Sequence, residues 1–291
     1  MKEAVTLESS RLNRWGLVDQ NEHLRMRAFL PLCISPLFDR LEEDRIISSL
    51  RAQGIERVLY FADFSQFQIA VPDQARLRIS HTLKVYHSRA DRDGKPCSAG
   101  RDRILWHSLC RISTDADPIT TVGMSKTLHV LTRPTAPPGE RMVTVVPEAL
   151  NHLRVYDWSE DFPVAANLSS SPAPRCYSRG VWGTANTDIK GHVNALEYIM
   201  GFENQTAFQL DHDGKNVGDY EITRAELLFR RPFMAGEPYT LASQTPHAGS
   251  SVVETSLAPS NVNTTSVAPL QPSILGRMTV APVGATLSTR K

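Results

Sequence analysis

An aspartate, a glycine and a histidine stand close together in the stretch from Asp188 to Tyr198, where a turn is predicted to lead into an amphipathic helix. A helix N-terminus presents unpaired backbone N–H groups and the positive end of the helix dipole. The N–H groups of Gly191 and His192 could therefore stabilise a carbonyl oxygen that becomes negative, while Asp188 acts as a base or nucleophile. The side chains of His192 and Asn194 would orient water or substrate. These residues predict attack on a polarised carbonyl carbon.

Two residues of this stretch also have a structural interpretation. Aspartate is a preferred helix N-cap, worth about 1 kcal/mol, so Asp188 could cap the helix instead of acting in catalysis, or in addition to it. Tyr198 would contact substrate if it lines a pocket, but an aromatic residue on an amphipathic helix is more typical of the core or of a pocket wall than of a catalyst.

The same pattern occurs a second time near the start of the chain, which favours internal duplication over chance recurrence. Each copy has a Trp-Gly pair, an Asp, a His four residues after the Asp and an aromatic residue ten residues after it: Trp15-Gly16, Asp19, His23 and Phe29, then Trp182-Gly183, Asp188, His192 and Tyr198. The first copy also carries Asn21, where the second has Lys190.

The second copy resembles the helix-entry signature of hot-dog-fold acyl thioesterases, in which an Asp is followed by Gly-His-Val-Asn-Asn and a Tyr. Every position matches except the second asparagine, which is Ala195 here. Plant-type acyl-carrier-protein thioesterases also carry an Asn two residues after the Asp, and Asn21 matches it. The resemblance implies hydrolysis of acyl thioesters, with Asp19, Asn21 and His23 as the equivalent catalytic set of the first copy.

Each half of the chain predicts one helical segment among several strands. In the first half, Pro31 and Pro36 interrupt the helix, Ser35 is a candidate cap, and residues 37–52 continue as a kinked or two-piece helix. The second helix is predicted over 192–210. Strand-like runs, of which 76–87 and 220–229 alternate, predict strands at 5–17, 58–71, 76–87, 104–112, 119–131, 177–182, 220–229, 239–244, 252–257 and 274–280.

A chain of 291 residues is long enough for about two ordinary domains. A helix with an antiparallel set of strands in each half is the pattern of a sheet wrapped around a helix. We therefore predict an α+β fold, a double hot-dog of two tandem units: residues 1–133, a linker or crossover at 134–174, and residues 175–291. The resemblance implies a monomeric pseudo-dimer or a homodimer.

Composition excludes several classes of protein. The net charge of +1 gives no sign of nucleic-acid or membrane binding. The four cysteines have no paired spacing, so neither a zinc site nor a disulfide framework is indicated. Phosphate-binding glycine loops, serine-hydrolase elbows and zinc-protease helix motifs are missing from the sequence. Without an apolar signal core or a run of membrane length, we expect a cytoplasmic protein.

Other residues are candidates for substrate contact. Tyr60 and Phe64 lie in an aromatic run that could border the first site, although core packing is the alternative. Arg230 and Arg231 could meet the phosphates of a pantetheine carrier or an acidic carrier protein, although they could equally be surface charges. We expect no cofactor, since the substrate, acyl-CoA or an acyl carrier protein, would bring its own pantetheine arm.

Thioester hydrolysis is therefore the leading hypothesis, and two alternatives stay open because a fold does not fix chemistry. One is another hot-dog reaction on the same substrates, such as dehydration, hydration or acyl transfer with decarboxylation in polyketide or fatty-acid-like biosynthesis. The other is a non-catalytic module that binds acyl groups or their carrier.

Overall fold

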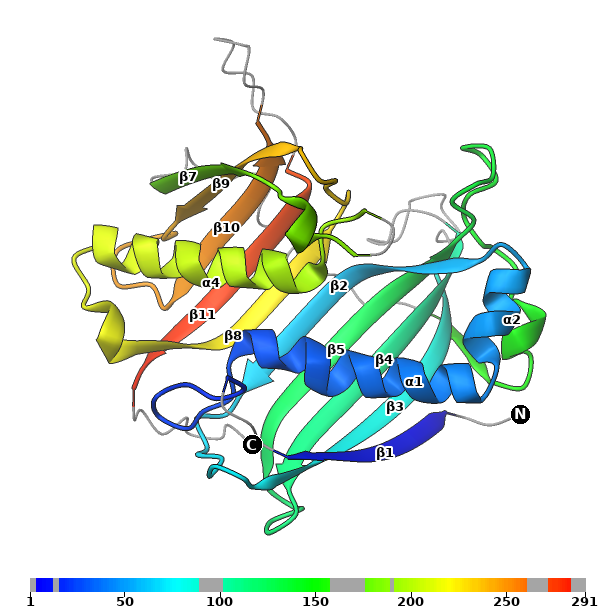
Figure 1. Cartoon of the computed structure of the whole chain (residues 1–291), viewed down its shortest axis with the longest axis horizontal. Coiled ribbons are helices and arrows are strands. Elements are labelled where there is room, and N and C mark those ends of the chain that lie inside the picture. The colour runs from blue at the N-terminus through cyan, green and yellow to red at the C-terminus, as the bar shows by residue number, and fades with distance from the viewer. Residues whose placement is uncertain are drawn as a thin grey trace. The chain divides into compact units, whose positions relative to one another are not determined.

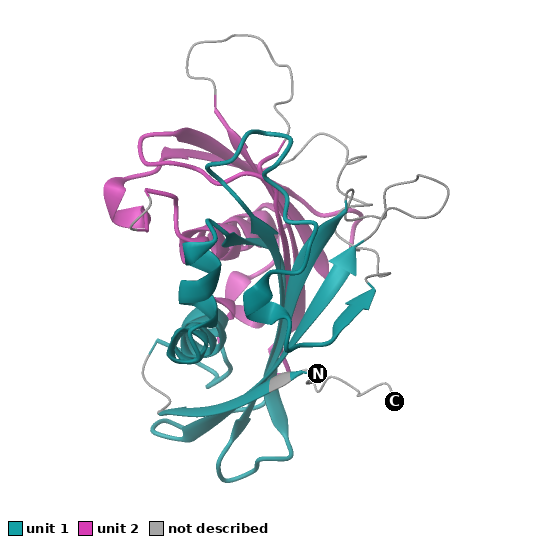
Figure 2. Ribbon diagram, turned by 90° about the vertical axis from the view of Figure 1, so that its right-hand side faces the viewer, with its two compact units in different colours: residues 1–24, 28–64, 69–163 teal, residues 25–27, 65–68, 164–291 magenta. Residues whose placement is uncertain are grey.

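The computed structural model describes residues 4–12, 16–88, 102–157, 176–188, 191–260 and 272–283. The chain divides into two compact units, which Figure 2 colours separately: unit 1 comprises residues 1–24, 28–64 and 69–163, and unit 2 comprises residues 25–27, 65–68 and 164–291. The domain boundaries expected from the sequence stay a prediction.

Unit 1 is built on an antiparallel sheet with the strand order β1-β3-β4-β5-β2. A short sixth strand, β6, runs parallel to β3 at its C-terminal end. The strands are β1 (Val5–Leu12), β2 (Glu56–Gln66), β3 (Arg76–Ser88), β4 (Arg103–Thr114), β5 (Thr121–Thr132) and β6 (Val155–Asp157). Strand β3 alternates between buried and more exposed side chains, as expected for a strand with one face on a core.

The helical segment of unit 1 is broken, as predicted. It consists of the π-helix η2 (Leu30–Ile34) and the helices α1 (Ser35–Glu43) and α2 (Ile46–Ala52). The 3-10 turn η1 (Met26–Ala28) comes just before it, and its first two residues are grouped with unit 2. The break between α1 and α2 lies at Arg45, which has a positive φ of 59°. The predicted cap at Ser35 is wrong: Ile34 already has helical dihedrals, and no side-chain cap bond is formed at this helix start.

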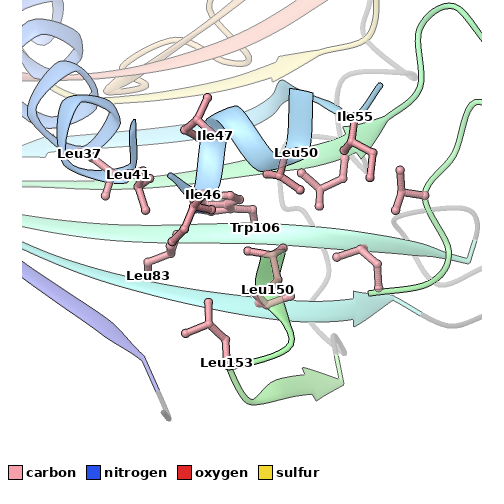
Figure 3. Packing of buried hydrophobic residues seen from close by; sticks show 14 residues of the cluster. Leu37, Leu41, Ile46, Ile47, Leu50, Ile55, Leu83, Trp106, Leu150 and Leu153 are labelled. Atoms are coloured by element: carbon pink, nitrogen blue, oxygen red, sulfur yellow. The ribbon is translucent and has the colours of Figure 1, made fainter. Parts of the chain in front are cut away.

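Both prolines are tolerated because each lies in the first turn of its helical piece, where no intrahelical bond needs its missing N–H. Helices α1 and α2 then bury an apolar face against the sheet (Figure 3). Their core contains Leu41, Ile47 and Leu50 from the helices and Trp106 from β4. Full burial of such a side chain is worth about 1.5–3 kcal/mol.

Part of the predicted linker adds to this core. The 3-10 turn η3 (Glu148–Leu150) and the strand β6 both lie within residues 134–174, and Leu150 and Leu153 are buried in the same cluster as the helices (Figure 3). Residues 158–175 lie outside the described part of the chain.

Unit 2 has an antiparallel sheet in the order β8-β11-β10-β9-β7, with helix α4 across it (Figure 1). The elements are β7 (Cys176–Val181), α4 (Ala195–His212), β8 (Tyr220–Phe229), β9 (Pro238–Gln244), β10 (Val252–Pro259) and β11 (Ile274–Pro282), with 3-10 turns η5 (Thr184–Asn186) and η6 (Val217–Asp219). Helix α4 packs closely on β11. A Cβ added at Gly276 would lie only 3.1 Å from the Phe202 ring, so the absence of a side chain at Gly276 permits this approach.

Each unit is thus an antiparallel sheet with a helical segment on one face. This confirms the predicted α+β fold with two hot-dog units in one chain. In the part of the chain that the structure describes, the helices lack the length and apolar character that crossing a membrane requires.

Candidate active site

The Asp-x-x-x-His stretch near the N-terminus folds into a tight, internally bonded turn. The N–H of Asp19 donates to the carbonyl of His23 at 2.9 Å, and the N–H of Glu22 donates to the carbonyl of Asp19 at 3.1 Å. The carboxylate of Asp19 accepts the N–H of His23 at 3.0 Å and that of Asn21 at 2.8 Å, both on Oδ1. Glu22 takes a positive φ of 62°.

The stretch in unit 2 repeats the bonds made by Asp19, Glu22 and His23 at the matching positions. The N–H of Asp188 donates to the carbonyl of His192 at 2.7 Å, and that of Gly191 donates to the carbonyl of Asp188 at 2.9 Å. Oδ1 of Asp188 accepts the N–H of His192 at 3.1 Å. Gly191 has a φ of 77°, at the position of Glu22 in the first copy. The two stretches therefore share a backbone conformation as well as a residue pattern.

The flanks of the two turns match as well. An isolated antiparallel bridge closes each turn, between Val18 and Leu24 in unit 1 and between Thr187 and Val193 in unit 2. Of the predicted motif, Trp15 and Lys190 lie outside the described residues.

The N–H groups predicted to hold an oxyanion are engaged within the second turn. Gly191 donates to the Asp188 carbonyl and His192 donates to the Asp188 carboxylate, so neither meets an oxyanion without giving up its bond. The acid before the turn satisfies these donors because it lies within reach of its own backbone four residues later. Their oxyanion role stays a prediction, and it requires that the two N–H groups exchange their bonds to Asp188 for bonds to the substrate oxygen.

The helix cap is Asn194, so the interpretation of Asp188 as the cap of α4 is wrong. Asn194 has extended dihedrals, and its side chain accepts the N–H of Leu196 at 3.0 Å. Asp188 is the first residue of the turn and lies too far before Ala195, where α4 begins, to cap the helix. The role expected of Asn194 in orienting water or substrate stays a prediction, and its oxygen is already a cap acceptor.

Two polar residues near the second turn, Asn186 and Glu197, were missed by sequence reasoning. Asn186 accepts the N–H of Gly183 at 3.0 Å on its side-chain oxygen and donates from Nδ2 to Glu197 at 2.9 Å. Its carbonyl accepts the N–H of Asn194 at 2.8 Å. Asn186 thereby ties the entry loop to the first turn of α4. Its signal, an Asn two residues before the Asp, has no counterpart in the first copy.

Tyr198 is a core residue of unit 2 with a satisfied hydroxyl. Its side-chain oxygen accepts the N–H of Phe233 at 3.0 Å, and the Trp182 ring meets it edge-on at 5.5 Å between centroids. Burial raises the pKa of the Tyr198 phenol to about 12, so it stays neutral. With 3% of its surface exposed, Tyr198 belongs to the core of unit 2. The predicted contact with substrate stays untested.

The aromatic residues Phe29 and Phe64 of unit 1 are also core residues. Phe29, ten residues after Asp19, stacks on Phe64 at 5.5 Å, and both are fully buried. A Cβ at Gly123 would lie 2.9 Å from the Phe29 ring, so glycine is required for this close approach. Tyr60 is half-buried beneath the guanidinium of Arg103, 4.6 Å from the ring centroid.

The two candidate arginines differ in their partners. The guanidinium of Arg231 forms an ion pair with Glu237 at 2.5 Å. Arg230 is exposed, and its backbone N–H donates to the carbonyl of Ser273 at 2.8 Å. Binding of a phosphate or an acidic carrier by this pair stays a prediction.

The first turn is the more enclosed of the two. His23 is only 8% exposed and Asp19 is half-buried, whereas Asp188 is exposed and His192 is half-buried. Partial removal from water strengthens the electrostatic effect of a carboxylate on its neighbours. The first copy therefore offers the better environment for chemistry at a carbonyl group.

The fold and the repeated turn define a double hot-dog protein. No family model matches the chain, and no curated protein matches it either. Among solved structures, it is similar to the 12:0-ACP thioesterase from Umbellularia californica, with a TM-score of 0.67 and 10% identity over 95% of this chain and 97% of that one.

It is also similar to an acyl-ACP thioesterase from Bacteroides thetaiotaomicron VPI-5482, with a TM-score of 0.62 and 11% identity over 95% of this chain and 98% of that one. At such low identity these likenesses show the fold. The resemblance to hot-dog thioesterases that the sequence indicated is confirmed at that level.

Proposed function

We propose that this chain hydrolyses acyl thioesters carried on coenzyme A or on an acyl carrier protein. The observation that carries the proposal is the Asp-x-x-x-His turn, which occurs before the helical segment of each unit with three matching backbone N–H bonds. The fold supports it, since two proteins of similar fold are described as thioesterases acting on acyl carrier protein substrates.

We assign the working site to the first turn. Only this copy has an asparagine two residues after the acid, and its Asp19 and His23 are less exposed than Asp188 and His192. Two N–H bonds to Oδ1 hold the Asp19 carboxylate in one orientation. A fixed carboxylate loses less entropy on reaching the reactive geometry.

The reaction follows from this arrangement. Asp19 takes a proton from a water molecule as that water attacks the thioester carbonyl carbon, and Asn21 and His23 orient the water and the substrate. The carbonyl oxygen becomes negative in the tetrahedral intermediate. When the C–S bond breaks, the thiol leaves with a proton and the carboxylic acid is released.

The test compares Asp19→Asn with Asp188→Asn in steady-state release of free thiol from acyl-CoA and from acyl carrier protein. Asparagine keeps a side-chain oxygen that can accept the N–H bonds, so each turn is expected to stay folded. Loss of a general base typically costs about 10²–10⁴-fold in rate. Asp19→Asn should show this loss in kcat, and Asp188→Asn should keep the wild-type rate.

The opposite pattern, with loss only in Asp188→Asn, would move the working site to unit 2. If wild-type protein binds acyl thioesters and neither substitution changes binding or turnover, the non-catalytic module is the better account. An enoyl absorbance change without thiol release would favour a dehydratase. Circular dichroism of each variant checks that the turn substitution has not unfolded the protein.

A further inference from the structure

Two thiols touch in the interior of unit 1. Cys33 lies in the π-helix η2 and Cys110 lies on β4, 77 positions further along the chain. The Cys110 thiol donates to the Cys33 sulfur, with the two Sγ atoms 2.9 Å apart. Only 2% of Cys33 and 1% of Cys110 is exposed. A disulfide has an S–S distance of about 2.05 Å, so an approach of less than about 1 Å joins them.

The neighbours of this pair in the sheet are polar. His81 on β3 and Ser125 on β5 are the register partners of Cys110, and both are buried. Among the described residues, neither ring nitrogen of His81 has a hydrogen-bond partner. Burial lowers the pKa of His81 to about 4, so the ring is neutral at physiological pH. The buried ring is therefore a weak base, and the case for this pair rests on the contact between its two sulfur atoms.

We propose that Cys33 and Cys110 are a redox-sensitive pair, which hydrogen peroxide converts into a disulfide that fixes the helical segment of unit 1 to β4. One sulfur attacks peroxide, the O–O bond breaks, and a sulfenic acid and one water result. The second sulfur attacks the sulfenic sulfur, the S–S bond forms, and the S–O bond breaks. Two thiols and one peroxide thus give one disulfide and two waters.

The local backbone suits such a step. π-turns are rare and looser than α-helix, and η2 contains Pro31 at its start. The segment is therefore better able than a regular helix to move the short distance required. Burial and the thiol–thiol hydrogen bond raise the pKa of Cys110 well above its ordinary value, so the reduced pair is slow to react at rest. Local opening of η2 would control the rate.

This inference is independent of the proposed hydrolysis and is tested without an activity assay. The full chain is treated with hydrogen peroxide, quenched with catalase, unfolded, alkylated and digested for mass spectrometry. We expect a cross-linked peptide containing Cys33 and Cys110, two hydrogens lighter than its reduced components. Two of the four cysteines should escape alkylation. Closing a long loop should also raise Tm by several degrees, reversibly with dithiothreitol.

Two variants separate the pair from the other thiols. Cys176→Ser should still form the cross-link, whereas Cys33→Ser should form none and show no rise in Tm. The wild-type peptide map decides the question even if Cys33→Ser folds poorly. Peroxide that leaves both thiols free, produces a sulfinic acid without a cross-link, or links either cysteine to Cys97 or Cys176 would overturn the proposal.

Discussion

At the scale of single residues, the aspartate of each turn forms hydrogen bonds through both its backbone and its carboxylate. Its backbone closes the turn, and its carboxylate accepts the N–H of the histidine four residues later. A carboxylate held this way is preorganised, which is the property that the proposed role of Asp19 as a base requires. The fourth residue of each turn has a positive φ, which suits Gly191 and strains Glu22.

Replacement of Gly191 by alanine should therefore destabilise the protein by about 1–2 kcal/mol, the usual cost of a left-handed conformation for a residue with a Cβ. The added methyl meets only an ordinary contact, 3.7 Å from the end of Met234, so the cost is in the backbone. Urea unfolding measures it. Gly201→Ala, inside α4, is the control and should raise stability by up to about 1 kcal/mol.

The converse substitution, Glu22→Gly, should relieve strain at the first turn and raise the free energy of unfolding by roughly 0.5–1 kcal/mol, since a left-handed non-glycine residue typically costs 1–3 kcal/mol and glycine loses part of this gain to chain entropy. Chemical denaturation again gives the value. A decrease in stability would mean that the Glu22 side chain contributes more than its backbone costs.

His81 makes stability depend on pH. Its pKa is lowered to about 4 in the folded protein by burial, against about 6.5 in an unfolded chain. The free energy of unfolding therefore has its full value, as far as His81 is concerned, above pH 6.5. It decreases as pH falls toward 4, because the unfolded state binds the proton more readily. His81→Leu should flatten the stability curve over this range and, by removing unpaired nitrogens, raise stability at pH 7.

Thermal unfolding at a series of pH values tests this expectation. Ile79→Leu, on the same face of β3, is the matched control: it should displace the whole curve without changing its slope between pH 4 and 6.5. A variant at His81 with an unchanged slope would show that the ring finds a partner for its charged form.

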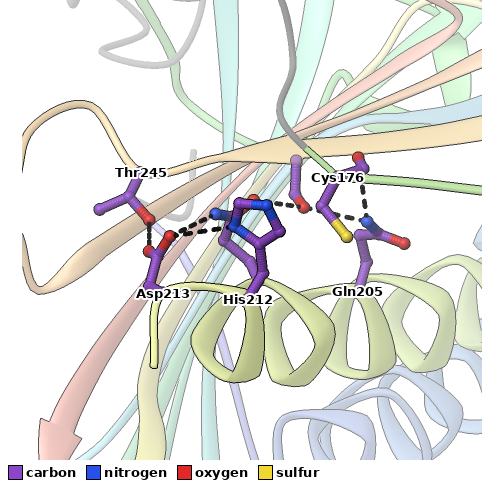
Figure 4. Close-up of polar contacts among 7 residues, drawn as sticks. Cys176, Gln205, His212, Asp213 and Thr245 are labelled. Carbon is purple, nitrogen blue, oxygen red and sulfur yellow. Dashed lines mark hydrogen bonds and ion pairs between the residues drawn. The ribbon is translucent and has the colours of Figure 1, made fainter. Parts of the chain in front are cut away.

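At the scale of elements, helix α4 buries the amides of Gln205 and Gln209 as well as apolar residues. Figure 4 shows the polar contacts of Gln205 and Asp213. Gln205 donates to the Ser243 hydroxyl at 2.9 Å, and that hydroxyl donates to Gln209 at 3.0 Å. Gln209 donates to Asp213 at 2.9 Å, and Thr245 donates to the same carboxylate. Both glutamines are fully buried, so the network fixes how α4 sits on β9.

Ser243→Ala should break this network at its centre. The Oε1 of Gln209 would lose the Ser243 hydroxyl, and an unsatisfied buried polar group costs about 1–3 kcal/mol. The Nε2 of Gln205 would lose the same hydroxyl but keep its bond to the Cys176 carbonyl at 3.3 Å. Hydrogen exchange should also show faster opening of α4. Ser256→Ala on β10, outside the network, is the comparison and should change stability far less. Equal losses in both variants would contradict a special role for the network.

The elements also differ in how far a sequence can predict them. Apolar patterns predicted every described strand except β6, most of them to within two or three residues, because each strand buries one face. The predictions for β1 and β2 extended too far at their C-terminal ends. Proline and glycine predicted the broken helix of unit 1. The cap at Asn194 was missed, because the turn after Asp188 determines where α4 begins. The contact between Cys33 and Cys110 depends on the packing of η2 against β4, which residue spacing does not contain.

At the scale of the whole molecule, one chain carries two hot-dog units. Each unit contains the same type of turn, and the units differ in the helical segment that follows it. Unit 2 keeps a continuous helix of 18 residues, whereas unit 1 divides the equivalent segment into short pieces. The sequence predicted the duplication from an Asp, a His and an aromatic residue at matched spacing, each set preceded by a Trp-Gly pair. The proposal that the first copy is the working one could not come from spacing, since it rests on the burial of Asp19 and His23, which arises only when unit 1 folds.

The measurement that tests the proposed hydrolysis most directly is product analysis in ¹⁸O-labelled water, with acyl-CoA and acyl carrier protein as substrates. Hydrolysis predicts equal amounts of free thiol and carboxylic acid, with the label in the acid, from wild-type protein and far less from Asp19→Asn. An unsaturated acyl product still attached to its carrier, or recovery of unchanged thioester from the folded wild-type protein, would contradict it.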